Sequence, residues 1–169
     1  MNAQTAMIPD YEDETGPQVL TGYLEMLALV ERLHRLLLEV VRDEFERAGR
    51  LDINAVQALL LFNIGNKTMT AGELRHRGYY QGSNVSYNLK KLVEAGYIDH
   101  RRSDTDRRAV RIRLTEKGMD VHFLVADLFR RHADELAMAD RLGPAGLDRL
   151  NADLRRVDRY WSEELRYVA

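Results

Sequence analysis

The sequence predicts a mainly α protein that carries one small β-hairpin, and three observations lead to this class. Apolar residues recur at helical spacing through most of the chain. Two residue pairs, Asn54 with Gln57 and Thr70 with Glu73, have the spacing of capping boxes at helix starts. The return half of residues 97–114 instead alternates apolar and polar side chains, as a strand does.

Composition bounds the class of protein. The 169 residues suit one domain with helical extensions, and the 45% of apolar residues is ordinary for a globular protein. The absence of Cys excludes disulfides and thiolate metal sites. No apolar run approaches the roughly 18 residues of a membrane span, and the first residues lack the pattern of a signal peptide. We therefore expect a cytoplasmic protein with no membrane partner.

The first part of the chain divides into an arm and a long helix. Residues 1–18 carry four acidic residues and neither Lys nor Arg, which predicts a flexible acidic N-terminal arm. A helix is expected over residues 20–48, ended by Gly49. Its apolar residues spread beyond one stripe, so the helix needs more than one packing partner. In a chain of this size, a second subunit is a natural candidate.

Three short helices are expected next, over residues 54–64, 70–77 and 83–95. The last two flank a short turn that contains glycine, which is the order of a helix-turn-helix. The helix over 83–95 separates into an apolar face and a hydrogen-bonding face. The apolar residues are Val85, Leu89, Leu92 and Val93, and the polar ones are Asn84, Tyr87, Asn88 and Lys91.

A basic hairpin and two further helices complete the predicted architecture. In residues 97–114 an arginine-rich hairpin follows the polar helix directly, which is typical of a winged helix-turn-helix. Thr115 is expected to cap a helix that runs to about residue 139, and Pro144 to begin the last helix. A coiled-coil-like seam follows in that helix: Leu147, Leu150, Leu154, Val157 and Trp161. We assign 50–115 to a winged helix-turn-helix DNA-binding domain, and 19–49 with 116–169 to long helices for dimerisation.

The distribution of charge favours a polyanionic partner. The whole chain has a net charge of −2. Residues 70–118 hold eleven Lys or Arg and six Asp or Glu, a net of +5, which leaves −7 for the remainder. Positive charge gathered on one segment is the electrostatic signature of a nucleic-acid site.

The predicted DNA-binding residues are amides, hydroxyls and cations on the polar helix and the hairpin. Asn can pair with adenine in the major groove, and arginine can enter the minor groove. The set is Ser83, Asn84, Ser86, Tyr87, Asn88, Lys91, Arg101, Arg102, Asp106, Arg107 and Arg108, with Asp106 placed to orient Arg108. Arg111 and Arg113 add positive charge to the same hairpin. The alternatives are a solvated helix face and an ordinary charged hairpin.

The chain resembles the MarR family of bacterial transcriptional regulators. The resemblance lies in Gly96-Tyr97-Ile98, in the wing motif Asp106-Arg107-Arg108, and in Leu114-Thr115-Glu116-Lys117-Gly118. Asp104-Thr105 stands where the family usually has Asp-Pro. The stretch from residue 77 to 92 resembles regulators of L,D-transpeptidase genes, which act in cell-wall remodelling.

The resemblance implies a homodimer on a palindromic double-stranded DNA operator, and a pocket for a small aromatic or phenolic effector. We hypothesise that the first two helices line this pocket through His34, Leu38, Val41, Leu59 and Phe62. The alternative for each of these residues is ordinary core packing.

No residue pattern indicates catalysis, so we predict that the chain is not an enzyme and uses no cofactor. Nucleophile elbows and phosphate-binding glycine loops are missing from the sequence. His132 with Glu135 has the spacing for zinc, but a solvated helix face explains the pair better, and we expect no metal site. The predicted function is transcriptional regulation through operator DNA. The alternative is a winged-helix module that uses the basic hairpin to dock another protein.

Overall fold

The computed structural model describes residues 15–76, 82–102, 110–138 and 142–167. In these ranges helices predominate, and three short strands form one antiparallel sheet. The elements are α1 (Thr15–Arg47), α2 (Ala55–Ile64), β1 (Met69–Thr70), α3 (Ala71–His76), α4 (Gly82–Glu94), β2 (Ile98–Arg102), β3 (Val110–Leu114), α5 (Glu116–Met138) and α6 (Pro144–Tyr167). The predicted class, mainly α with a small β-hairpin wing, is confirmed.

The long first helix begins earlier than expected. α1 starts at Thr15 rather than residue 20, so residues 15–18 are helical and do not belong to an arm. Pro17 does not prevent this, because the first four N–H groups of a helix have no partner within the helix. The acidic residues of the predicted arm lie outside the described part of the chain.

Both predicted capping boxes are present. The Asn54 side chain accepts a hydrogen bond from the Gln57 backbone N–H at 2.9 Å, and the Gln57 side chain accepts from the Asn54 N–H at 3.2 Å. Thr70 Oγ1 accepts from the Glu73 N–H at 3.1 Å, and Glu73 Oε2 accepts from the Thr70 N–H at 2.6 Å. Local side-chain chemistry therefore fixes where α2 and α3 begin.

The sheet contains one strand more than the predicted hairpin. Its order is β1-β3-β2, and Ile112 of β3 pairs with Met69 on one side and with His100 on the other. Ile112 is buried while Arg111 and Arg113 are exposed, as the alternation in the sequence predicts. The strand β1 anchors the chain just before α3 and so holds the helix-turn-helix against the hairpin.

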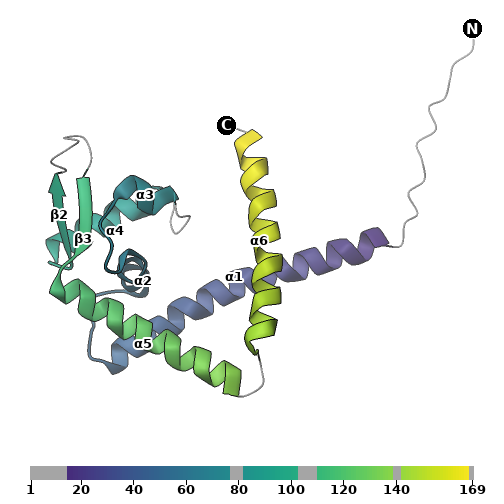
Figure 1. The fold of residues 1–169 in the computed structure, drawn as a ribbon, viewed down its shortest axis with the longest axis horizontal. Helices are drawn as coiled ribbons and strands as arrows, with labels where there is room; N and C mark the ends of the chain where they lie inside the picture. The colour runs from purple at the N-terminus through teal and green to yellow at the C-terminus, as the bar shows by residue number, and fades with distance from the viewer. Residues whose placement is uncertain (1–14, 77–81, 103–109, 139–141, 168–169) are drawn as a thin grey trace, which may run out of the picture.

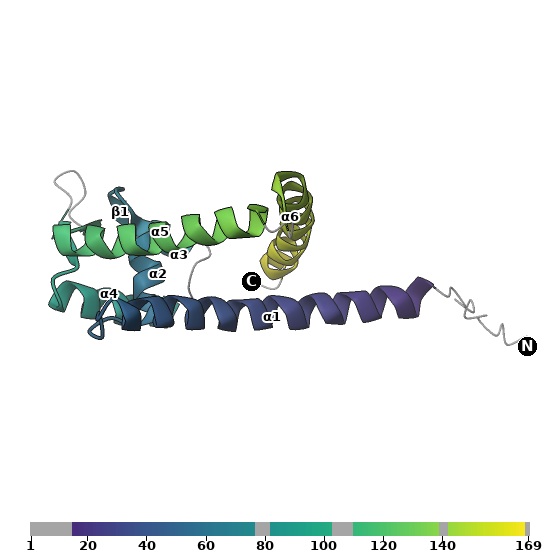
Figure 2. The same ribbon diagram turned by 90° about the horizontal axis from the view of Figure 1, so that it is seen from below.

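The core lies around α2, which is buried at Ala58, at Leu59 to Leu61 and at Ile64. The end of α1 contributes Val41 and Phe45, and α5 packs Val121, Val125 and Leu128 against the other side. Figure 1 shows α2 to α4 and the hairpin gathered at one end, with α6 standing apart from them. In Figure 2, α1 and α5 run along the molecule on either side of α2.

A close backbone contact joins the hairpin to the long helix α5. The Thr115 N–H donates to the Tyr97 carbonyl at 3.1 Å, and the Thr115 hydroxyl donates to the Gly96 carbonyl at 2.7 Å. At Gly118, one turn along, an added Cβ would lie 2.2 Å from the Tyr97 carbonyl oxygen. Only glycine allows α5 to pass this close to the start of β2.

Tyr97 also links this junction to the loop before α2. Its hydroxyl donates to Asp52 Oδ2 at 2.6 Å, and Lys117 Nζ lies 3.4 Å from the same oxygen and 4.0 Å from the centre of the Tyr97 ring. The hydrogen bond from Tyr97 is the main reason why the pKa of Asp52 is lowered. Burial raises the pKa of Tyr97, with the Asp52 hydrogen bond as the next cause.

We expect Gly118→Ala to lower the free energy of unfolding by about 1–3 kcal/mol, because the new methyl group overlaps the Tyr97 carbonyl. Chemical denaturation measures the change. Gly22→Ala is the matched control, since Gly22 is also helical but has no atom within 4 Å of an added Cβ. That control should raise the free energy of unfolding by about 0.5–1 kcal/mol through helix propensity. Equal effects of the two substitutions would contradict the close contact.

We expect Tyr97→Phe to destabilise the protein by about 1 kcal/mol at neutral pH, since Asp52 is partly exposed and solvent screens the pair. The folded pKa of Asp52 is depressed, so its contribution is present above about pH 4 and is lost as the pH falls through the folded pKa. Thermal melts across acid pH should therefore show the difference between wild type and variant shrinking. A difference that stays constant into strong acid would argue against this pair.

Candidate nucleic-acid interface

The helix α4 presents a polar surface over an apolar base. Leu89 and Leu92 are buried in the core, and Val93 is half-buried. On the outer side Tyr87 is 62% exposed, and Ser86 and Lys91 are exposed as well. The apolar face fixes the rotation of α4, so the polar side chains are held on the outside of the domain.

Neighbouring groups pre-order the outer surface of α4. Lys91 Nζ lies 6.0 Å from the centre of the Tyr87 ring, which is a long cation–π contact. The same nitrogen is 3.6 Å from Glu94 Oε2, and Lys90 Nζ is 3.9 Å from Glu94 Oε1. Such exposed pairs contribute little to stability, so Lys91, on the polar face, can exchange the carboxylate for a phosphate at small cost.

Basic residues continue onto the sheet. Arg111 and Arg113 of β3 are two residues apart, so their side chains lie on the same face of the sheet. Asp99 of β2 stands opposite Arg113, and Arg113 donates hydrogen bonds of 3.1 and 3.2 Å to Asp99 Oδ2. Arg113 is therefore paired with an acidic side chain, whereas the exposed Arg111 leaves positive charge on this face of the strand.

Part of the predicted DNA-binding set cannot be placed. Ser86, Tyr87, Asn88 and Lys91 are described on α4. The wing motif Asp106-Arg107-Arg108 lies outside the described residues, and so do the side chains of Ser83, Asn84, Arg101 and Arg102. For these residues the sequence-based assignment stays a prediction.

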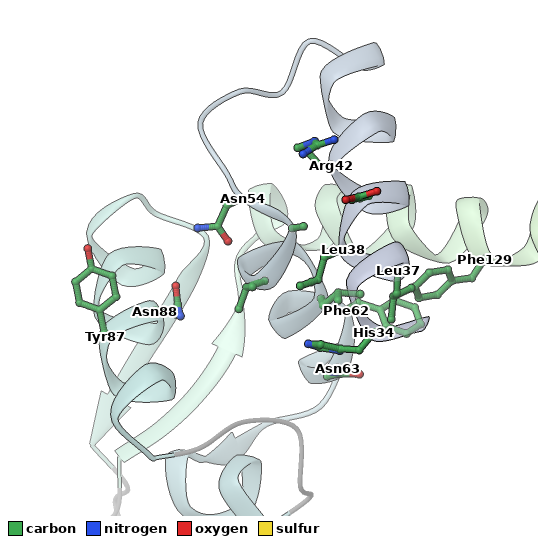
Figure 3. Close-up of a pocket in the computed structure, with 14 residues that line it drawn as sticks. His34, Leu37, Leu38, Arg42, Asn54, Phe62, Asn63, Tyr87, Asn88 and Phe129 are labelled. Atoms are coloured by element: carbon green, nitrogen blue, oxygen red, sulfur yellow. The ribbon is translucent and has the colours of Figure 1, made fainter. Parts of the chain in front are cut away.

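A groove opens between α1, α2 and α4, with a volume of about 1040 Å³. Figure 3 shows side chains from both α1 and α4 around it. The described lining consists of His34, Leu37, Leu38, Glu39, Arg42, Asn54, Ala55, Val56, Leu59, Phe62, Asn63, Tyr87, Asn88 and Phe129. The groove therefore extends from the long helix to the polar helix of the helix-turn-helix.

Four of the five residues predicted for an effector pocket line this groove: His34, Leu38, Leu59 and Phe62. Val41 does not, because its side chain is 0% exposed and belongs to the core. The sequence reasoning missed Tyr87, Asn88 and Phe129, which come from α4 and α5. No periodicity within the first two helices could have indicated them, since only the tertiary fold brings these elements together.

The described residues give little support to a metal site or a membrane-spanning segment. Within them, no three His, Asp or Glu side chains gather as a metal site would require. None of the described helices has a stretch long and apolar enough to cross a membrane.

The architecture is that of a winged-helix DNA-binding protein, with a helix-turn-helix, a basic hairpin and a buried supporting helix. A family model for the winged helix DNA-binding domain matches residues 53–118. The exopolysaccharide II synthesis transcriptional activator ExpG of Rhizobium meliloti (strain 1021) is 34% identical over 161 residues, which cover 92% of this chain and 80% of ExpG. The chain belongs to the same family of winged-helix transcriptional regulators as ExpG.

Two solved structures illustrate the shared fold. The MarR protein from Peptoclostridium difficile DA00132 is 18% identical, with a TM-score of 0.70 over 99% of this chain and all of that one. FabT of Streptococcus pneumoniae, solved in complex with DNA, is 19% identical with a TM-score of 0.66, over 83% of this chain and 98% of FabT. At these identities, the likeness concerns the fold alone.

We expect Lys91→Ala to weaken duplex binding at every sequence tested and to reduce the slope of log affinity against log salt by about 1, because one phosphate contact is lost. Fluorescence anisotropy of a labelled genomic fragment at several salt concentrations measures both quantities. Lys90→Ala is the control, since it removes the same charge from the flank of α4. If the two variants behave alike, the polar face of α4 does not face the phosphates.

Proposed function

We propose that the protein acts as a homodimer on palindromic operator DNA, and that a small aromatic or phenolic effector bound in the groove changes its affinity for the operator. The observation that carries the proposal is the polar face of α4, held outward next to the hairpin, whose strand β2 contacts α4. Its proposed place of action is the cytoplasm, where the genomic DNA lies.

DNA recognition is supported by the side chains that α4 exposes. Ser86 and Tyr87 offer hydroxyl groups, and Lys91 offers a cation. Hydroxyls and lysine bind phosphates and fix the register of a helix in the major groove. The wing arginines Arg107 and Arg108 would contribute minor-groove contacts beside them, as the sequence predicts.

Homodimerisation is supported by apolar surface that one chain leaves exposed. On α1, Leu24 is 55% exposed and Leu33 is 62% exposed. On α6, Leu150 and Leu154 of the predicted seam are exposed as well. The Trp161 indole N–H donates to the Tyr23 hydroxyl at 3.2 Å and ties α6 to α1. Large apolar side chains left exposed along two long helices favour an interaction with another chain.

Effector control is supported by the position of the groove. An occupant would contact α1, which carries the proposed subunit contacts, and Tyr87 and Asn88 of α4 at once. A ligand that favours one arrangement of these helices would shift the affinity for DNA by the difference in its affinity for the two arrangements.

The target genes are proposed to act at the cell envelope. The stretch from residue 77 to 92 resembles regulators of L,D-transpeptidase genes, which supports cell-wall remodelling. The relative ExpG is named as an activator of exopolysaccharide synthesis, which supports a related class of surface polymer genes.

Selection of bound fragments from total genomic DNA tests the function. A shared palindromic sequence should emerge, and affinity for it should fall steeply as salt increases. Arg108→Ala should weaken binding while leaving the melting temperature unchanged. No binding to any fragment at low salt would instead favour the alternative, a winged-helix module that docks proteins.

We expect the double variant Leu150→Asp, Leu154→Asp to convert a dimer into monomers, because it places charges in the proposed apolar seam. Sedimentation velocity measures the change. Arg159→Asp introduces the same side chain on another side of α6 and should leave the dimer intact. A wild-type protein that sediments as a monomer at all concentrations would refute the homodimer.

A further inference from the structure

The C-terminal end of α4 is held partly by groups from outside the helix. The Tyr97 N–H donates to the Leu92 carbonyl at 2.9 Å, and Gly96 takes a positive φ of 75°, which is how a helix that ends at glycine closes itself. The carbonyl of Ala95, the residue after α4, instead accepts a hydrogen bond from Lys117 Nζ of α5 at 3.1 Å. A cation at this end also complements the partial negative charge of the helix terminus.

Lys117 joins this end of α4 to the loop that precedes α2. Its Nζ lies 3.4 Å from Asp52 Oδ2 and 4.0 Å from the centre of the Tyr97 ring. Tyr97 is 1% exposed, so the ammonium group rests on a fixed surface. The Lys117 side chain itself is 46% exposed, and each of its contacts therefore adds little to global stability. Together the contacts determine a position rather than a large stabilisation.

The tilt of α4 is the property that Lys117 can control. Leu89 and Leu92 are buried, which fixes the rotation of α4 about its own axis. The tilt depends instead on where the ends of the helix are held. A helix of 13 residues is about 20 Å long, so a tilt of about 5° at the C-terminal end moves the N-terminal end by about 2 Å.

A movement of this size affects base contacts more than phosphate contacts. The N-terminal residues of a recognition helix contact the base edges, and a hydrogen bond is lost when its atoms move apart by about 1 Å. Phosphate contacts carry no sequence information, and they can form again at a neighbouring position. Control of the tilt is therefore control of sequence discrimination.

We infer that Lys117 is a positioning residue for sequence-specific DNA recognition: together with Asp52 it holds the C-terminal end of α4, so that the base-reading side chains keep their place. Lys117 acts through α4 and not through a contact of its own with DNA. This inference rests on the proposed role of α4 in operator recognition and adds the group that sets the orientation of the helix.

The test compares two labelled duplexes, a fragment recovered by selection from genomic DNA and the same fragment with its bases in scrambled order. Fluorescence anisotropy on the full chain measures both affinities, and their ratio measures sequence discrimination. Lys117→Met keeps the apolar stem of the side chain and removes the cation. We expect this ratio to fall about tenfold, while the affinity for the scrambled duplex stays within about twofold and the slope against log salt is unchanged. Equal losses on both duplexes, with a smaller slope, would identify a phosphate contact and overturn the inference.

Three further variants separate position from charge loss and from stability. Lys90→Met removes the same charge from the exposed flank of α4 and should leave the ratio unchanged. Val125→Ala removes part of the core about two turns along α5 and should lower the melting temperature without changing the ratio. Lys117→Arg keeps a cation with N–H donors and should keep the ratio within about threefold of wild type. A ratio that falls as far in Val125→Ala as in Lys117→Met would overturn the inference, because loss of stability would then explain both.

Asp52→Ala is a variant for which charge and position predict opposite results. Loss of a negative charge strengthens the attraction to DNA, so electrostatics alone predicts tighter binding to both duplexes. The positioning role predicts a lower ratio, by about three- to tenfold, because Lys117 loses its partner. The double variant Asp52→Ala, Lys117→Met should lose no more discrimination than Lys117→Met alone, since both residues act through one contact. Additive losses, or a wild-type ratio in Asp52→Ala, would contradict the inference.

The outcome is separable from the proposed function. The preference of the wild-type protein for the selected fragment tests the proposed function without any substitution. If the wild type discriminates and Lys117→Met discriminates equally well, only the inference on Lys117 is refuted. A wild type that binds both duplexes equally refutes sequence-specific recognition, and the inference with it.

Discussion

The architecture depends on the close contact between α5 and the start of β2. Thr115, which follows β3, donates hydrogen bonds to the carbonyl groups of Gly96 and Tyr97. Gly118 lets the helix α5 pass close to the same backbone. Because Tyr97 also binds Asp52 before α2, three segments distant in the sequence meet at one point. The helix α4, the hairpin and the long helix α5 therefore form one packed unit, in which α4 and the hairpin keep a fixed separation.

Charge is organised around the same unit. The positive segment forms α4 and the hairpin, while α1 and α6 carry many of the acids in alternation with arginine. Ion pairs such as Arg131 with Glu44 join α5 to α1, and Glu44 is largely buried there. A pair of this kind resists screening more than an exposed pair does. Positive charge is therefore concentrated at one end of the molecule. The charged side chains of the long helices instead form ion pairs that join these helices to each other.

Most of the fold could be predicted from local chemistry. Capping residues, glycines and the alternation in β3 fixed the helices and the hairpin to within a few residues. Residues 15–18 were missed because the acidic composition of residues 1–18 suggested a flexible arm, although the first turn of a helix tolerates Pro17. The strand β1 was missed because two residues cannot establish a pattern, and Met69 pairs with Ile112 far along the chain. The α4 and α5 residues of the groove, such as Tyr87 and Phe129, depend on tertiary packing that periodicity does not report.

The uninterrupted course of α5 has a mechanical consequence. A helix of 23 residues is a rod of about 35 Å, and its two ends belong to the winged domain and to the connection with α6. A rod amplifies rotation into displacement: a tilt of about 5° at one end moves the other by about 3 Å, close to the spacing of phosphates along one DNA strand. Small angular changes between the long helices are therefore enough to displace the winged domain by about the axial rise of one nucleotide.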